Sequence, residues 1–285
     1  MVDDRTNVRP PGVAGMFYPS EKDKLSALIE KLYRQEEPQI SPEPVSGTII
    51  GGIVPHAGIE YCGRQAVHFF DSVRHNEPDP DTVIILHPNH HGAGPSLSVD
   101  DHHYWEVSNG IIKTDMEFAR QLNLPLSATA QAREHSAEVI VPYILHFFSD
   151  FVKLVSVNMV DQSYGAAREL AAKMHDAARK LKRRILVIAS TDFSHFVSRS
   201  EARKMDDIVL DEITSRNPEG VYRSIKENYI SVCGYGPIMT LMEYSSLLDH
   251  DYKTRILSRG DSGNIKGSSD VVSYVSALFH TDRAL

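Results

Sequence analysis

Histidines follow three apolar runs in this 285-residue sequence. Each run stops in a polar loop: residues 49–54 before His56, residues 83–86 before His90, and residues 185–189 before Asp192 and His195. Neutral imidazole is the commonest metal ligand among side chains, and it also accepts or donates protons near neutral pH. If the three loops lie together, they supply either a metal site or an acid–base site.

The apolar runs predict how these loops are brought together. Short β-branched runs closed by turn residues are typical of buried strands. Ligands of open α/β sheets bind at the carboxyl ends of the strands, so we expect the loop side chains to share one edge of one sheet. Glycines such as Gly58 and Gly92 leave room for a ligand to approach closely.

Helical patterns alternate with the strand patterns. Helices are expected at 64–73, 134–148, 164–182, 201–215, 218–227 and 237–248, with Pro142 breaking the second and Asn217 capping the fifth. Residues 253–258 and 270–279 are typical of antiparallel strands. The alternation favours a three-layer α/β sandwich with a mixed, mainly parallel central sheet and some antiparallel edge strands. Since no linker divides the chain, residues 1–285 are expected to form one domain.

The segment from Glu134 to Glu138 offers a further pair of chemical groups. His135 and Glu138 are three residues apart, so a helix places them on one face. They could form a metal pair, or an acid–base pair in which the carboxylate orients the imidazole. A solvated helix start, where glutamates suit the helix dipole, explains the same spacing equally well.

Asp192 and the two cysteines complete the candidate residues. Asp192 directly follows a buried run, where a carboxylate could bind a metal, fix the tautomer of a nearby imidazole or cap a helix. Cys233 lies in a glycine-containing loop, where its thiolate would be a soft metal ligand or a nucleophile. A lone cysteine is more often a small buried apolar residue, and this interpretation is preferred for Cys62.

Composition narrows the classes of function. The net charge of −8 and a single basic cluster at 179–184 argue against nucleic-acid binding, because cations at a helix end suit the helix dipole. No apolar stretch is long enough for a membrane span, and residues 1–11 do not resemble a signal peptide, so a cytoplasmic protein is expected. No phosphate loop or dinucleotide fingerprint is present, so no nucleotide cofactor is expected.

Taken together, these loops resemble the Memo family, the relatives of the mediator of ErbB2-driven cell motility. The matching stretches span nearly the whole chain in the family's order: Ala14-Gly15-Met16-Phe17-Tyr18, Pro55-His56-Ala57-Gly58, Pro88-Asn89-His90-His91, Glu134-His135-Ser136-Ala137-Glu138, Ser190-Thr191-Asp192-Phe193-Ser194-His195 and Val232-Cys233-Gly234. The family's fold is similar to that of class III extradiol dioxygenases, which are non-haem iron enzymes. The resemblance implies metal positions at His56, His90 and Cys233, and pocket positions at Asp192, His195 and His135.

The resemblance leaves three functions open. The first is a metal-binding protein holding copper or Fe(II), with zinc also possible, in which Asp192, His195 and His135 either support the metal ligands or act as acid–base groups. The second is a ring-opening dioxygenase, which is weakened because the dioxygenases carry a carboxylate where Cys233 falls, and a thiolate favours softer ions. The third is a pocket that binds a peptide or small molecule without catalysis. Microbial members of the family often accompany radical-SAM proteins, which implies a partner of that kind.

Overall fold

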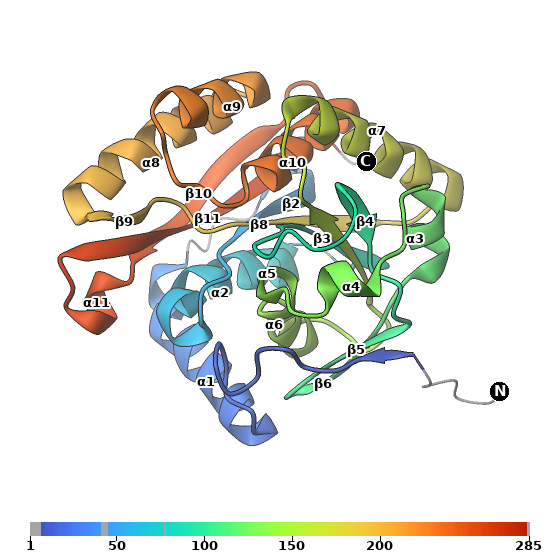
Figure 1. The fold of residues 1–285 in the computed structure, drawn as a ribbon, viewed down its shortest axis with the longest axis horizontal. Helices are drawn as coiled ribbons and strands as arrows, with labels where there is room; N and C mark the ends of the chain where they lie inside the picture. Colours follow the sequence, from blue (N-terminus) through green and yellow to red (C-terminus); the bar gives the residue numbers. More distant parts are fainter. Residues whose placement is uncertain (1–6, 41–44, 77, 284–285) are drawn as a thin grey trace.

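Four parallel strands form the centre of the computed structural model, which describes residues 7–40, 45–76 and 78–283 (Figure 1). In spatial order they are β2 (Thr48–Val54), β8 (Ile185–Ser190), β3 (Thr82–Pro88) and β7 (Lys153–Met159). Nearly every residue of these strands is buried, as expected for a sheet covered on both faces. The three predicted strands that precede the histidine-bearing loops are therefore confirmed as neighbours in one sheet.

Antiparallel strands flank this parallel centre. On one side β11 (Asp270–Thr281) pairs with β2, and β10 (Lys253–Asp261) pairs with β11. On the other side β4 (Leu97–Val99) pairs with β7. A short strand, β9 (His195–Ser198), also pairs with β11. The predicted mixed sheet with antiparallel edge strands is confirmed.

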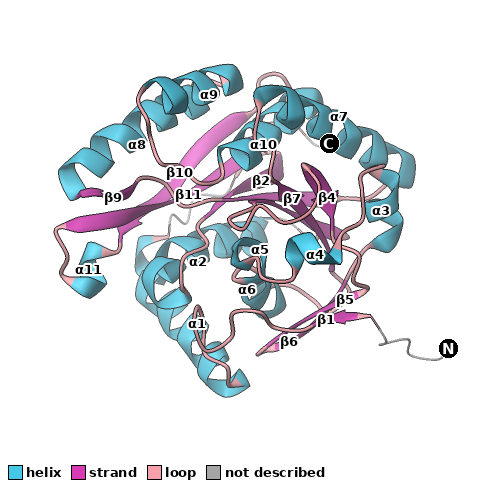
Figure 2. Cartoon of the chain, viewed as in Figure 1, coloured by secondary structure: helices cyan, strands magenta, loops and turns pink. Residues whose placement is uncertain are grey.

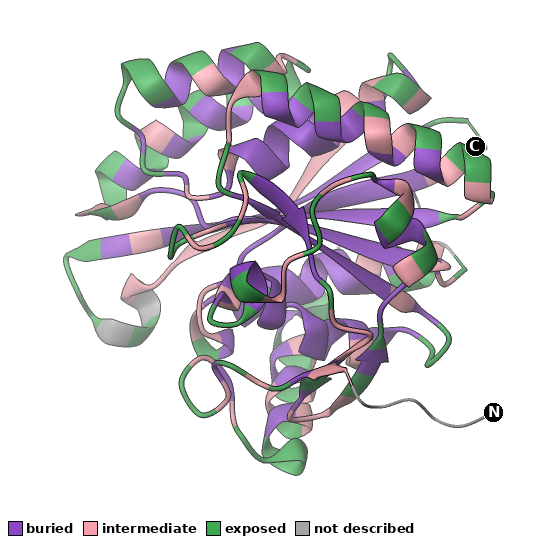
Figure 3. Cartoon of the chain, turned by 45° about the vertical axis from the view of Figure 1, so that its right-hand side comes forward, coloured by how far each residue is buried: buried purple, intermediate pink, exposed green. Residues whose placement is uncertain are grey.

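Helices cover both faces of the sheet (Figures 1 and 2). One face is packed by α3 (Met116–Gln121), α7 (Tyr164–Leu181), α8 (Arg199–Thr214), α9 (Pro218–Glu227) and α10 (Tyr235–Leu248). The other face is packed by α1 (Lys22–Glu36), α2 (Ile59–Asn76) and α6 (Val141–Phe147). Short helical segments lie at η1 (Glu37–Gln39), α4 (Ala128–Gln131), α5 (His135–Glu138) and α11 (Gly263–Lys266). The three-layer α/β sandwich is thus confirmed, and the strands between the layers are buried (Figure 3).

Two local predictions depend on proline and on a capping side chain. The helix expected at 134–148 is divided into α5 and α6, and Pro142 lies in the first turn of α6, where its missing N–H costs nothing. Asn217 caps α9 as expected, because its side chain accepts a hydrogen bond from the N–H of Gly220.

A second, three-stranded sheet was not predicted. It contains β1 (Val8–Arg9), β5 (Tyr104–Val107) and β6 (Gly110–Lys113) and lies below α4 in Figure 2. Its strands are two to four residues long, too short to show a period in the sequence. In the described part of the chain, no helix is long and apolar enough to cross a membrane. Of residues 1–11, which do not resemble a signal peptide, the first six lie outside the described residues. That the whole chain forms a single domain stays a prediction.

Candidate metal centre

The carboxyl ends of β2, β3 and β8 bring three separate parts of the chain together. Val54 of β2 lies opposite Ser190 of β8, and Leu86 of β3 lies opposite Ala189 of β8, so the three strands end at the same edge. His56 and His90 each follow two residues after their strand. As expected from the sheet topology, the two imidazoles share this edge.

Cys233 reaches the same edge from the loop before α10. The backbone N–H of Cys233 donates to the carbonyl of Asp192, 3.3 Å away. A side chain on the neighbouring Gly234 would place its Cβ 2.4 Å from the carbonyl oxygen of Ser190, so only glycine lets this loop lie against the end of β8. The close approach carries the thiol to the two histidines.

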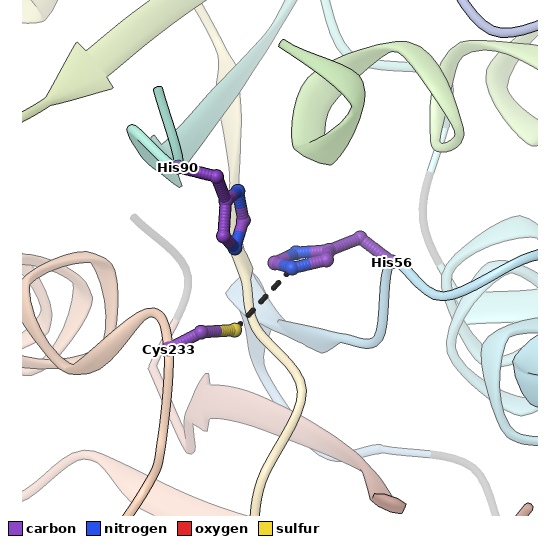
Figure 4. Close-up of side chains that lie close together, drawn as sticks. All are labelled: His56, His90 and Cys233. Atoms are coloured by element: carbon purple, nitrogen blue, oxygen red, sulfur yellow. Dashed lines mark hydrogen bonds between the residues drawn. The ribbon is translucent and has the colours of Figure 1, made fainter. Parts of the chain in front are cut away.

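His56, His90 and Cys233 point toward one another (Figure 4). One donor atom from each lies within 4.8 Å of the others, and the Cys233 Sγ is 3.3 Å from the His56 Nε2. His56 is buried, Cys233 is half-buried and His90 is exposed, so the cluster opens to solvent on the His90 side. Sequence reasoning therefore selected three side chains that the structure brings together.

Hydrogen bonds fix which nitrogen of His56 faces the thiol. The hydroxyl of Ser190 donates to the carbonyl of Ser136 at 2.6 Å, so its oxygen accepts from the Nδ1–H of His56 at 2.7 Å. The Nε2 of His56 then carries the lone pair, directed at Cys233. Burial, and next the neighbouring imidazoles, hold the pKa of His56 well below its usual value, which keeps the ring neutral.

Glu134 performs the same task for His90. Its carboxylate accepts the backbone N–H of His90 at 2.7 Å and the ring Nδ1–H at 2.8 Å, which leaves the Nε2 with the lone pair. Burial acts to raise the pKa of Glu134, but the hydrogen bond to His90 and the nearby imidazoles outweigh it and hold that pKa well below the usual range. Each of the two histidines is therefore oriented by a partner behind it, an arrangement typical of metal-binding histidines.

His135 lies beside this cluster and forms a second group with His90 and Glu134. Its ring stacks on His90 with 4.6 Å between ring centroids and on Phe17 with 4.5 Å. Its Nδ1 is 3.4 Å from the Glu134 carboxylate. Burial lowers the pKa of His135 to about 4, so the imidazole is neutral near pH 7 and able to accept a proton.

Asp192 lies behind His56 and outside the described groups of converging ligand atoms. Its carboxylate accepts the backbone N–H of His56 at 2.8 Å. Burial raises the pKa of Asp192 to about 6, against the opposing effect of that hydrogen bond. The helix-cap interpretation of Asp192 is wrong, because the chain continues into strand β9 and the carboxylate holds the His56 backbone.

His195 is hydrogen-bonded to Ser231, in the loop that also carries Cys233. Its backbone N–H donates to the Ser231 hydroxyl at 2.8 Å, and its Nδ1–H donates to the Ser231 carbonyl at 2.7 Å. His195 is not among the described groups of converging ligand atoms. The roles predicted for His195, Asp192 and His135 stay predictions.

The suggested pairing of His135 with Glu138 is wrong, and so is a solvated helix start. Glu138 is completely buried and forms an ion pair with Arg9 at 2.5 Å, and its polar contacts among the described residues do not include His135. The carboxylate that meets His135 is Glu134, which sequence reasoning did not single out. Its place immediately before His135, as the side-chain cap of α5, is the one local signal that pointed to it.

The fold and the site together define an α/β sandwich that carries two histidines and a cysteine at one edge of its central sheet. Residues 9–278 match the family model described as Memo-like protein. The chain is 37% identical to a MEMO1 family protein of Methanobrevibacter smithii over 284 residues, covering 95% of this chain and 99% of the relative. It is also 37% identical to a MEMO1 family protein of Methanocaldococcus jannaschii, with 95% and 98% covered. The chain belongs to the Memo family.

A solved structure shares the fold. It is that of an uncharacterized protein from Escherichia coli K12, with a TM-score of 0.50, 15% sequence identity, and coverage of 73% of this chain and 90% of that chain. At this identity the similarity concerns the arrangement of the helices and strands.

Proposed function

We propose that His56, His90 and Cys233 bind one transition-metal ion. The main support is that both imidazoles direct a lone pair toward the thiol. They do so because the opposite ring nitrogen of each donates a hydrogen bond, to Ser190 in His56 and to Glu134 in His90. Burial and the Asp192 carboxylate raise the pKa of the Cys233 thiol, so a bound ion would have to displace its proton. Two neutral imidazoles and a thiolate form a reasonable ligand set for such an ion.

The donor set favours soft or borderline ions. Thiolate ligands select Cu(I) and zinc, whereas Fe(II) in oxygen-activating sites takes two histidines and a carboxylate. We therefore propose copper in the reduced state as the preferred ion, with zinc and Fe(II) as competitors. When bound, the ion would supply Lewis-acid or redox chemistry at the solvent-facing side of the cluster.

Anaerobic titration of the metal-free protein against a chromogenic Cu(I) chelator tests this proposal. We expect one equivalent of Cu(I) bound by the wild type, and affinities at least about 100-fold weaker in the variants His56→Ala and Cys233→Ser, because a lost ligand costs more than a lost supporting hydrogen bond. The matched controls are His91→Ala, an exposed neighbour of His90, and Cys62→Ser, a buried thiol bonded to the Ala57 carbonyl. Equal Cu(I) binding by all five proteins would refute the proposal.

The neutral ring of His135 favours a second candidate function, a metal-dependent reaction in which His135 accepts a proton from the substrate. The support is its position, because its ring nitrogen lies within 4.8 Å of ligand atoms of His90 and Glu134. Oxygen uptake by the Fe(II)-loaded or copper-loaded protein with a panel of catechols tests it. His135→Gln should lower uptake and leave metal affinity within about threefold of wild type, because His135 is not a proposed ligand. Wild-type oxygen uptake no greater than that of His56→Ala would exclude this reaction.

A further inference from the structure

A cavity of about 510 Å³ lies at the opposite edge of the sheet from the histidines. It is lined by the first residues of β2 and β8, by the end of α7 and by the last turns of α10. Its volume falls within the range of small-molecule sites in proteins. The cavity does not share a lining residue with the proposed metal centre.

Most of the uncharged residues that line the cavity are apolar. Ile50, Leu186 and Leu248 contribute aliphatic side chains, and Tyr244 contributes an aromatic ring that is 3% exposed. In the part of the chain that the structure describes, no hydrogen bond reaches the Tyr244 hydroxyl. Burial raises the pKa of Tyr244 far above its usual value, so the hydroxyl keeps its proton. Tyr244 lines the cavity, and its hydroxyl, which has no hydrogen-bond partner among the described residues, can donate to a ligand that reaches it.

The rim of the cavity is positively charged. Four cationic residues line it: Arg179, Lys182, Arg183 and Arg184. Arg183 forms ion pairs with Asp115 and Glu117, and the guanidinium of Arg184 donates to the carbonyl of Asp79. Arg179 and Lys182 are exposed and form no ion pair with any described residue. These two cations are therefore available to neutralise a ligand.

The backbone places Lys182 on this rim at a conformational cost. Lys182 ends α7 with a φ of 51°, in the left-handed region where glycine or asparagine is favoured. A lysine at this position keeps a long cation beside the cavity. The basic cluster noted in the sequence thus lines this cavity as well as the end of α7.

We propose that this cavity binds a small amphipathic anion, with an apolar body and a single carboxylate or similar head group. The apolar interior would bury the body, Arg179 and Lys182 would pair with the head group, and the Tyr244 hydroxyl would donate to a ligand oxygen. The cavity is too confined for nucleic acid, and the net charge of −8 also disfavours it. The site is independent of the proposed metal centre.

Calorimetric titration of the full chain with decanoate and with 1-decanol tests the proposal. The two ligands have the same apolar chain and differ in the charge of the head group. We expect one molecule of decanoate bound at least about tenfold more tightly than 1-decanol, because only the carboxylate forms ion pairs with the two unpaired cations. Decanoate binding that is absent, or no tighter than that of 1-decanol, would overturn the proposal.

Three substitutions locate the binding. Arg179→Gln and Lys182→Gly should each weaken decanoate binding about fivefold. Lys182→Gly also relieves the left-handed backbone, so its loss of binding cannot be assigned to misfolding. Lys180→Gln is the matched control, because Lys180 is an exposed lysine of the same helical turn that does not line the cavity. Equal effects of Lys180→Gln and Lys182→Gly, or loss of binding in His56→Ala, would place decanoate elsewhere and overturn the proposal.

Discussion

Glu134 and Glu138 lie one helical turn apart and are both buried, yet they serve different parts of the molecule. The oxygens of Glu134 meet the ring and backbone of His90. Those of Glu138 meet the guanidinium of Arg9, the backbone N–H groups of Gly12 and Val13, and the hydroxyl of Tyr18. One carboxylate orients a candidate metal ligand, and the other attaches the N-terminal segment to the domain.

The difference teaches that residue type and spacing do not assign a role to a buried carboxylate. Its role follows from the partners that the fold delivers. Arg9 comes from β1, where its guanidinium also lies 4.1 Å from the centre of the Trp105 ring. His90 comes from the end of β3. Neither partner is near residues 134–138 in the sequence.

The largest expected effect is on stability. Glu138→Gln should lower the free energy of unfolding by about 3–5 kcal/mol, because it leaves the buried guanidinium of Arg9 without its counter-charge. Urea denaturation followed by circular dichroism measures this loss. Glu106→Gln, an exposed carboxylate of β5, is the control and should change stability by less than about 0.5 kcal/mol. The folded fraction of Glu138→Gln should bind Cu(I) as wild type does, and a tenfold loss of affinity would break the comparison.

Glu134→Gln should produce the opposite pattern. The amide cannot carry the negative charge that holds the Nδ1–H of His90, so we expect Cu(I) affinity to fall about 10–100-fold. Competition with a chromogenic chelator measures the change. A stability loss as large as that of Glu138→Gln, with affinity unchanged, would mean that Glu134 is structural too.

Ser190→Ala sharpens the comparison on the other histidine. Without the acceptor at Ser190, the tautomer of His56 is no longer fixed, and Cu(I) affinity should fall about tenfold. Ser276→Ala is the matched control, because Ser276 is a buried strand serine whose hydroxyl has no hydrogen-bond partner among the described residues. The same chelator assay applies, and equal affinities of the two variants would remove the proposed role of Ser190.

The smallest expected effect comes from a helix cap that is part of neither cluster. Asn217→Ala removes the side-chain oxygen that accepts the N–H of Gly220 and should cost about 1 kcal/mol of stability. Thermal unfolding measures the cost, and Cu(I) affinity should stay unchanged. A larger loss of affinity here than in Glu134→Gln would show that the chelator assay reports stability.

Much of the layered fold could be predicted because strands and long helices repeat their pattern locally. The runs at 49–54, 83–86 and 185–189 are buried strands, and the long helix expected at 164–182 is observed as α7. The small sheet of β1, β5 and β6 could not be found in this way. Its strands are very short, and Arg9 is buried there only because Glu138, 129 residues away, neutralises it.

The candidate site was predictable in part for the same reason. Strand ends indicated the loops of His56 and His90, whereas the role of Cys233 came from family resemblance. Glu134 and Ser190 were missed because an orienting residue is defined by what it contacts. Those contacts are set by packing between segments that are distant in the sequence, so a local sequence pattern cannot predict them.

The contact between Cys233 and His56 joins residues 177 positions apart. A fragment that lacks either His56 or Cys233 cannot contain the three-ligand site. Contacts between residues so far apart in the sequence are slow to form during folding. Stoichiometric metal binding by the three residues would therefore appear only as refolding is completed. If an ion binds only the native chain, it also shifts the folding equilibrium by mass action, so the unfolding temperature would rise with the concentration of the free ion.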